Sequence, residues 1–180
     1  MLRRGVASSG DGARRATLRR SAFSTIVAFA LLLAPAVAGL ARDLPPRHAR
    51  VTTIVDGDTI RVDLDHHLTT IRLIGVDTPE LSPRNRPSVP AQPFAHEAAA
   101  FARRTLVGRR VRLEFESADR IDKYGRTLAY VFLPNGTFFN RELVRQGYGR
   151  AYVVFPFRFR KQFLADEAVA RRERRGLWAQ

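Results

Sequence analysis

The sequence predicts an α+β protein in which a five-stranded β-barrel carries about three helices. Residues 58–64 and 109–116 alternate apolar with charged side chains, which is typical of half-buried strands. Three other segments have apolar residues at helical spacing, and each of them ends at a glycine. The order is three strands, a helix, two strands and two helices, which is compatible with a Greek-key barrel of the OB type. Periodicity alone leaves other α+β arrangements open.

The first 41 residues are predicted to be an export signal that lies outside the folded domain. Paired arginines precede a mostly apolar run at 22–38, and small residues suit cleavage after Ala38 or after Ala41. The arginine pair directly before the run leaves the Sec and twin-arginine routes both open. An uncleaved anchor is the alternative, because residues 22–40 could just span a bilayer. The folded part is therefore expected to be secreted or periplasmic, with no stable membrane association once the signal is removed.

The folded domain is expected to span residues 51–180. Residues 42–50 contain two adjacent prolines and are predicted to be a linker. The first three strands are expected at 51–56, 58–64 and 69–76, and the first two meet at an Asp-Gly-Asp turn.

The second half of the domain begins after a long loop at 81–93 that holds four prolines. A loop of this length in a compact domain indicates function or mobility. The predicted elements after it are a helix from Phe94 to Gly108, a strand at 109–116, a charged turn at 119–126, a strand at 127–133, a short helix at 140–146 and a basic helix at 159–175.

The charge balance indicates a polyanionic partner. Lys and Arg number 31 against 17 Asp and Glu, a formal charge of +14, and residues 1–41 supply +5 of it. The remaining excess favours nucleic acid or an acidic membrane surface. Nearly all the cations are arginine, which suits bidentate contacts to phosphate, although codon bias explains many surface arginines equally well. The chain has no cysteine, which excludes disulfides, thiolate nucleophiles and cysteine–zinc sites.

Charged groups that could carry chemistry gather at strand ends and turns. An arginine inside an apolar strand needs a partner, because burying an unpaired charge is costly. Phosphate or the neighbouring carboxylates would serve as that partner. The groups are Asp56 and Asp58 on either side of Gly57, Asp77 and Glu80 on either side of Thr78-Pro79, Arg72 inside the third strand and Arg126 at the start of the fifth.

Three blocks of sequence resemble the signature blocks of the staphylococcal nuclease (thermonuclease) family, in the same order and at similar spacing. They are Val55–Thr59, Ile71–Glu80 and Asp122–Arg126, and weaker matches extend the resemblance from about residue 51 to 178. The resemblance implies an OB-type barrel and a monomeric, Ca²⁺-dependent endonuclease. Such an enzyme hydrolyses DNA and RNA with little sequence specificity, prefers single-stranded or frayed regions and leaves 3′-phosphate ends.

The resemblance also implies a calcium site. Asp58 and Asp77 match the family's calcium carboxylates, and the backbone carbonyl of Thr78 matches a third oxygen ligand. Asp56 would orient the ligands or bound water without binding the ion itself. These oxygen donors agree with the preference of Ca²⁺ for hard ligands.

Six further positions match residues that act on the substrate in the family. Glu80 matches the proposed general base, although an organiser of water and arginines is an equally open role. Arg72 and Arg126 match the guanidinium groups that hold the phosphate. Lys123, Tyr124 and Tyr152 match nucleotide contacts, with Tyr124 equally open to packing in its turn.

Several alternatives accompany this interpretation. Relatives that keep the barrel but lose the carboxylates are binding modules, so a catalytically weak nucleic-acid-binding barrel is the second hypothesis. The departures from the family are Val154 in place of a second tyrosine, a longer loop after Glu80 and a shorter segment after Gly147. Residues 155–160 are expected mainly in the core, and Arg171–Arg175 on a solvated helix face. His66 and His67 are expected in solvent, and His96 at the start of the first helix.

Overall fold

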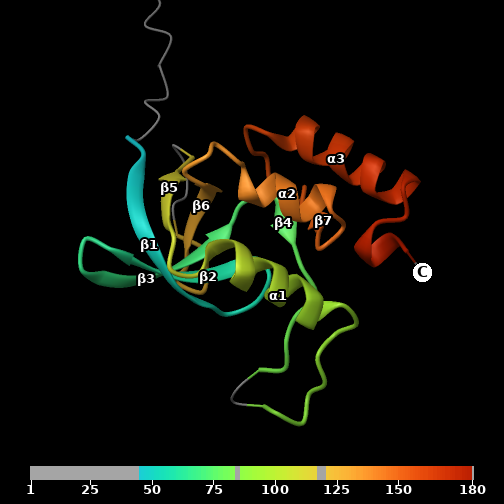
Figure 1. Cartoon of the computed structure of the whole chain (residues 1–180), viewed down its shortest axis with the longest axis horizontal. Helices are drawn as coiled ribbons and strands as arrows, with labels where there is room; N and C mark the ends of the chain where they lie inside the picture. Colours follow the sequence, from blue (N-terminus) through green and yellow to red (C-terminus); the bar gives the residue numbers. More distant parts are fainter. Residues whose placement is uncertain (1–44, 84–85, 117–120, 180) are drawn as a thin grey trace, which may run out of the picture. The chain divides into compact units, whose positions relative to one another are not determined.

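The computed structural model describes residues 45–83, 86–116 and 121–179. Within them lies a closed barrel with strand order β1-β2-β3-β6-β5, completed by pairing of β5 with β1 (Figure 1). All pairs are antiparallel except β3 with β6. The predicted fold class is confirmed. The barrel strands are β1 (Arg47–Ile54), β2 (Thr59–Leu64), β3 (His67–Leu73), β5 (Arg110–Glu114) and β6 (Thr127–Phe132).

The barrel begins earlier than the sequence predicted. Strand β1 starts at Arg47, so residues 47–50 belong to the barrel and not to the linker expected at 42–50. Pairing with β5 explains the difference, because His48 and Arg50 lie opposite Arg112 and Arg110. Their polar side chains hid the strand from a hydrophobic pattern. The predicted export signal at 1–41 lies outside the described residues.

The strand expected at 69–76 is two strands in the structure. It breaks after Leu73 because Gly75 adopts φ 81°, in the left-handed region that favours glycine. The chain then forms β4 (Val76–Asp77), which pairs with β7 (Arg150–Ala151) in a separate two-stranded sheet. Sequence reasoning missed this second sheet, whose strands are too short to show a period.

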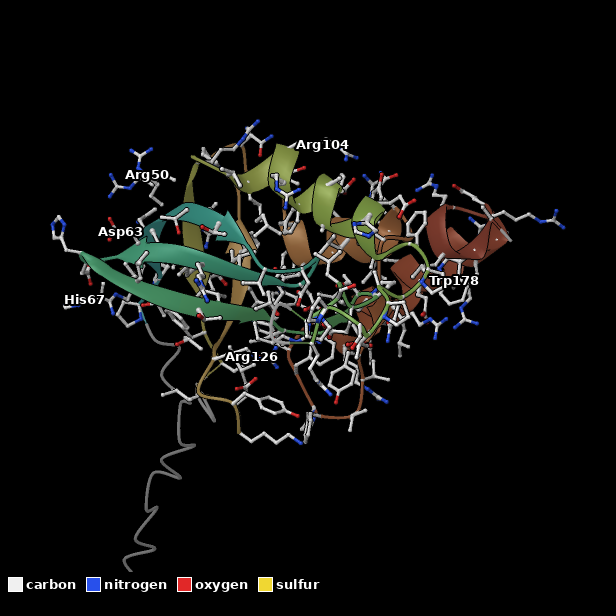
Figure 2. All side chains as sticks on the ribbon, turned by 90° about the horizontal axis from the view of Figure 1, so that it is seen from below. Arg50, Asp63, His67, Arg104, Arg126 and Trp178 are labelled. Atoms are coloured by element: carbon white, nitrogen blue, oxygen red, sulfur yellow. The ribbon has the colours of Figure 1, made fainter. Side chains whose placement is uncertain are left out.

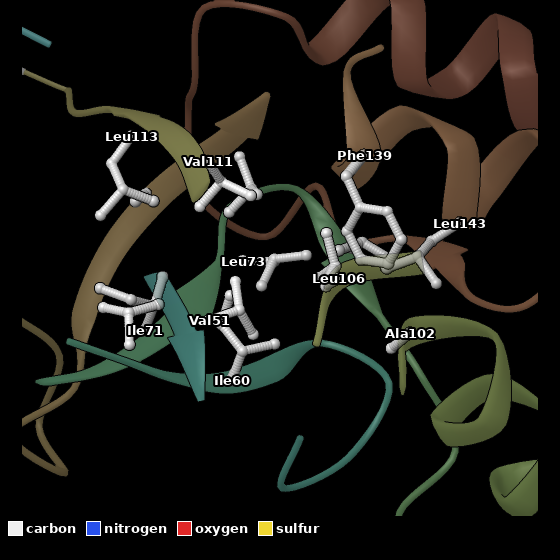
Figure 3. Packing of buried hydrophobic residues seen from close by; sticks show 14 of the residues in the cluster. Val51, Ile60, Ile71, Leu73, Ala102, Leu106, Val111, Leu113, Phe139 and Leu143 are labelled. Atoms are coloured by element: carbon white, nitrogen blue, oxygen red, sulfur yellow. The ribbon is translucent and has the colours of Figure 1, made fainter. Parts of the chain in front are cut away.

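The hydrophobic core fills the barrel and continues under the three α-helices of the described residues. Ile60, Ile71 and Leu113 are fully buried within the barrel (Figure 3). Leu106 of α1 (Ala95–Leu106) and Phe139 of α2 (Phe139–Arg145) join the same cluster. The helices therefore rest on the barrel through an apolar interface, which fixes the loops that connect them.

Helix α3 (Arg160–Arg172) packs beside α2 through a paired charge. The guanidinium of Arg141 donates to both carboxylate oxygens of Asp166, at 2.6 and 2.9 Å, and these bonds raise the pKa of Arg141. Phe157 and Phe159, just before α3, pack on the core as expected, but Phe155 is 65% exposed. No helix within the described residues is long and apolar enough to cross a bilayer.

The last described turn returns to the end of α2. A 3₁₀ helix, η1 (Gly176–Trp178), follows α3, and Leu177 N donates to the carbonyl of Gly147. Gly147 and Gly176 touch through their backbones, and both have positive φ. A side chain at either position would collide with the other segment, so the contact depends on glycine. The ring of Trp178 packs between the guanidinium groups of Arg150 and Arg171.

The remaining surface predictions agree with the structure. His66 and His67 are exposed, and His96 lies in the first turn of α1. Arg171 and its neighbours are exposed on α3 or just after it, mostly in ion pairs with Glu167 and Glu173. These arginines therefore form a solvated helix face.

Candidate active site

A cleft of about 700 Å³ lies where β3, β6 and the segment after β7 meet. Of the residues predicted from the sequence, those that line it are Arg72, Asp77, Glu80, Lys123, Tyr124, Arg126 and Tyr152. Asp56, Asp58 and Thr78 do not line the cleft but are buried and connected to it through hydrogen bonds. The structure thus brings together groups from four separate parts of the chain.

Arg72 lies between two carboxylates. It forms an ion pair with the fully buried Asp58, and its Nη2 donates to Asp77 Oδ1 at 2.9 Å. The β2–β3 register places Thr59 opposite Arg72, and therefore Asp58 beside it. The turn at Gly75 brings Asp77 to the other side. The arginine predicted inside an apolar strand thus has carboxylate partners.

The loop before β2 packs on the segment that follows β4. Asp58 Oδ2 accepts a hydrogen bond of 2.7 Å from the backbone N–H of Thr78, and Asp56 Oδ1 accepts one of 3.2 Å from Asp58 N. A Cβ on Gly57 would approach the side chain of Thr78 to 2.7–2.9 Å. Glycine is therefore required for the close approach that joins the two carboxylate-bearing loops.

Arg126 is held by Asp122, a residue for which the sequence suggested no role. Asp122 accepts hydrogen bonds from the backbone N–H groups of Tyr124 and Arg126 and, at 2.7 Å, from Arg126 Nε. Burial alone would raise the pKa of Asp122, but these hydrogen bonds together lower it below its usual value. The D-x-x-x-R spacing across a tight turn was the available signal for this role.

A hydroxyl links the two arginines. Arg126 Nη1 donates to Thr59 Oγ1 at 3.3 Å, and that hydroxyl donates to Asp58 Oδ1 at 3.1 Å. Asp58 in turn pairs with Arg72. Within the described residues Arg126 Nη2 has no hydrogen-bond partner, so this donor is available to a ligand in the cleft.

Four carboxylates share this site with one closely paired arginine. Burial raises the pKa of Asp56, and the positive charge of Arg72 and hydrogen bonds from Thr59 offset only part of that effect. Partial burial, and then the negative charge of Asp56, raise the pKa of Glu80. Asp77 adds to the repulsion at Glu80. The site therefore carries an excess of negative charge beside the arginines.

The Glu80 backbone is tied to the end of the proline-rich loop. Glu80 N donates to Gln92 Oε1 at 3.0 Å, and Gln92 N donates to the Glu80 carbonyl at 2.9 Å. Sequence reasoning gave Gln92 no role, because nothing in its neighbourhood distinguishes it from other loop residues. The pair of hydrogen bonds fixes the backbone from which the Glu80 carboxylate projects.

Gln92→Ala is expected to lower kcat about tenfold, with a loss of folding stability of about 1 kcal/mol for the missing hydrogen bond. Removal of the acceptor breaks one of the two hydrogen bonds that hold the Glu80 backbone and leaves the carboxylate itself unchanged. Steady-state kinetics and thermal denaturation check the prediction. Gln92→Glu is the matched control, since it retains an acceptor oxygen at the same position. Equal kcat values in Gln92→Ala and the parent protein would contradict the positioning role.

Exposed aromatic rings line part of the cleft. Tyr124 is 70% exposed, and its ring also contacts its own turn, with Lys123 Nζ 5.0 Å and Arg126 Cζ 5.2 Å from the ring centroid. Tyr152 also lines the cleft, and the centroid of its ring lies 6.2 Å from that of Phe155. Sequence reasoning assigned Phe155 mainly to the core, and the Arg-interleaved aromatic run was the signal that favoured the cleft. Exposed rings of this kind stack on nucleobases.

The donor set fits a hard cation. Asp58 and Asp77 provide carboxylate oxygens on either side of Arg72, and the Thr78 hydroxyl is buried without a hydrogen-bond partner among the described residues. These all-oxygen donors and the excess negative charge suit Ca²⁺ better than a softer metal. No group of three or more His, Cys, Asp or Glu side chains within the described residues forms a ready metal cluster. A cation here would therefore depend on backbone oxygen, water or substrate for its remaining ligands.

A small closed barrel whose cleft combines carboxylates, guanidinium groups and exposed aromatic rings is typical of a protein that processes nucleic acid. The comparisons with known proteins agree. The family model for staphylococcal nuclease homologues matches residues 70–180. The chain is 37% identical to a thermonuclease of Staphylococcus hyicus, over 72% of this chain and 75% of that protein.

Two further relatives have nuclease names. A thermonuclease of Staphylococcus intermedius is 39% identical over 71% of this chain and 74% of its own length. The SPbeta prophage-derived endonuclease YokF of Bacillus subtilis is 36% identical over 69% of this chain, although the match covers only 42% of YokF. The chain belongs to the staphylococcal nuclease family, and it is a nuclease, a hydrolase of nucleic acid.

Proposed function

We propose that this nuclease is an exported, Ca²⁺-dependent endonuclease that hydrolyses DNA and RNA with little sequence specificity and leaves 3′-phosphate ends. One observation carries the proposal: Glu80 lines the same cleft as Arg126, Arg72 and Asp77, and the buried Asp58 pairs with Arg72 from outside the cleft. A base candidate, two phosphate-binding cations and paired carboxylates are the parts that phosphodiester hydrolysis needs.

Glu80 is proposed to accept a proton from the attacking water. The water oxygen forms a bond to phosphorus while the bond from phosphorus to the 5′-oxygen breaks. The leaving 5′-oxygen takes a proton from solvent, and the phosphate remains on the 3′ side. The Glu80 side chain is exposed to the cleft, so water reaches it, and the Gln92 contacts keep its backbone in place.

Arg126 and Arg72 are proposed to bind the nonbridging oxygens of the scissile phosphate. Arg126 is oriented by Asp122 and Thr59, which leaves its Nη2 for substrate. Arg72 is fixed more firmly, since its guanidinium is only 12% exposed and touches both Asp58 and Asp77. Arginines that are already oriented stabilise the charge that grows on phosphorus oxygens without a cost of reorganisation at the moment of reaction.

Asp58, Asp77 and the carbonyl of Thr78 are proposed to hold the calcium ion, and Asp56 to support them from behind. The bound ion would add Lewis-acid stabilisation of charge on the phosphate. With only two protein carboxylates the site is expected to be weak, which suits an exported protein in calcium-rich surroundings. The basic and apolar segment at 1–41 supports the proposed export.

The exposed aromatic rings support a preference for single-stranded or frayed DNA and RNA. Tyr124, Tyr152 and Lys123 are proposed to contact the nucleotide next to the scissile phosphate. Stacking on an exposed ring accepts any base, because every base has a π-face. The enzyme is proposed to act as a monomer on these substrates.

Calcium removal is expected to abolish cleavage. Purified protein with single-stranded DNA or RNA at pH 8–9 should cut both in millimolar Ca²⁺ and neither in excess EGTA, with recovery when Ca²⁺ is restored. Asp77→Asn should raise the Ca²⁺ concentration for half-maximal activity by about 10- to 100-fold. Undiminished cleavage in EGTA would overturn the calcium assignment. Salt-sensitive binding without cleavage in any metal would favour the nucleic-acid-binding barrel.

A further inference from the structure

We propose that the outer face of β1 and β5 is a second binding surface for the nucleic-acid backbone, separate from the cleft. We call it the basic face and define it as His48, Arg50, Arg110 and Arg112. Their strand neighbours Ala49, Val51, Val111 and Leu113 are buried in the barrel. Because side chains alternate along a strand, the four basic residues point outward together.

The pairing of the strands puts like charges directly opposite each other. Arg50 lies opposite Arg110, and His48 lies opposite Arg112. Like charges in such cross-strand pairs destabilise a sheet. Within the described residues neither Arg50 nor Arg110 has an ion pair, and Arg50 bonds only to the carbonyl of Gly108. The pairing of like charges therefore does not help the fold, whereas a polyanion would neutralise it.

Acidic residues border the basic face without neutralising it. Asp63 of β2 lies opposite Arg50, and Glu114 pairs with Arg112. Glu114 is shared with Arg158, whose Nη2 donates to it at 2.7 Å. Three arginines and a histidine thus face two carboxylates, one of which also serves an arginine outside the face.

The basic face contains a cleft of its own. A hollow of about 270 Å³ is lined by His48, Arg110 and Arg112 together with Phe132 and the turn that follows it. The guanidinium of Arg112 lies 4.3 Å from the ring centroid of Phe132, which holds its plane in place. This hollow shares no lining residue with the cleft that contains Glu80. Figure 2 shows Arg50 and Asp63 on a part of the barrel away from Arg126.

Strand β6 gives the scale of the separation. Arg126 lies at the active-site cleft and Phe132 at the basic face, six residues later, which is about 20 Å along a strand. Glu116, on the side toward the active-site cleft, accepts hydrogen bonds from the Tyr130 hydroxyl and from Arg158 N.

Nucleic acid fits this surface better than a membrane does. Proteins that bind at a bilayer interface combine basic residues with exposed large apolar side chains. The exposed large hydrophobic residues of the described chain include none on the basic face. The inference extends the nuclease activity and is independent of calcium and of the residue that takes the proton.

The test compares long and short substrates. Arg50→Gln/Arg110→Gln is expected to weaken binding of a ~24-nucleotide single strand about tenfold and to reduce the slope of log K against log salt by about 1.4 for two lost phosphate contacts. Binding of a dinucleotide, too short to span from the active-site cleft to the basic face, should change less than about twofold. Fluorescence anisotropy in EDTA, with substrate integrity checked on a gel, measures both without cleavage.

Arg103→Gln/Arg160→Gln is the matched control, since it removes two exposed arginines on α1 and α3. The proposal requires that this pair leave the salt slope and the difference between long and short strands intact. Equal losses in both double variants, or equal losses for both strand lengths, would mean a general charge effect and would overturn it. Unchanged binding of the long strand, or affinity of the basic face for anionic lipid vesicles alone, would overturn it as well.

Discussion

Glu80→Gln is expected to lower the rate of phosphodiester cleavage by about 10²- to 10⁴-fold, the usual contribution of a positioned general base. Glutamine has nearly the same shape but cannot accept the proton of the attacking water. Single-turnover cleavage of a labelled oligonucleotide at saturating protein and Ca²⁺ isolates this step from binding. A rate within about threefold of the parent protein would remove Glu80 from the chemistry.

The fold should tolerate this substitution. The two hydrogen bonds to Gln92 use the backbone N–H and carbonyl of Glu80, which glutamine keeps, and a glutamine amide can still donate to Asp56, the partner of the Glu80 carboxyl group. The midpoint of thermal unfolding is therefore the control and is expected to change little. Oligonucleotide affinity in the variant should also remain, since Arg72 and Arg126 are intact. A large fall in either quantity would attribute the lost rate to damage instead of chemistry.

Arg72→Met is expected to abolish cleavage and to destabilise the protein by about 3–5 kcal/mol, because it leaves the buried carboxylate of Asp58 without its cation. Chemical denaturation measures the loss. Asp58→Asn in the same chain removes the unpaired charge, so the double variant should be more stable than Arg72→Met alone. A double variant that is less stable would refute the coupling.

Arg112→Met provides the comparison for an exposed pair. Its ion pair with Glu114 has side chains 36% and 24% exposed, and solvent screening limits such a pair to about 1 kcal/mol or less. The contrast between the two variants measures what burial adds to the Asp58–Arg72 interaction. Similar losses in both would mean that Arg72 contributes mainly by packing.

The sequence predicted most of the barrel strands because they alternate clearly, and the family resemblance then selected the barrel among other α+β arrangements. Val62 and Val111 are buried while their neighbours carry charge, and this two-residue alternation is visible in the amino-acid sequence. The start of β1 was missed because the polar residues Arg47, His48 and Arg50 surround the buried Ala49 and hide the alternation. Long-range pairing with β5 decides that segment, and no local pattern contains such a contact.

The residues of the candidate site could likewise be predicted only in part. Three short blocks indicated Arg72, Glu80 and Arg126, and the structure places all three on one cleft. Gln92 and Asp122 act through hydrogen bonds whose partners depend on how turns close, so residue type alone does not identify them. The sequence also did not predict which carboxylates are buried. Asp58 is fully buried, whereas Asp77, with the same predicted role, has a side chain that is 51% exposed.

The backbone contact between Gly147 and Gly176 has a consequence for the order in which the molecule is completed. Residues 175–178 lie against the end of α2, and the ring of Trp178 contacts the guanidinium of Arg150. Arg150 belongs to β7, the strand that pairs with Asp77. Residues 175–178 are synthesised after every barrel strand. β7 therefore gains its final support only after these residues have been synthesised. Until then the barrel strands are all present but β7 lacks this contact. A nascent chain is therefore expected to fold its barrel before it becomes an active enzyme.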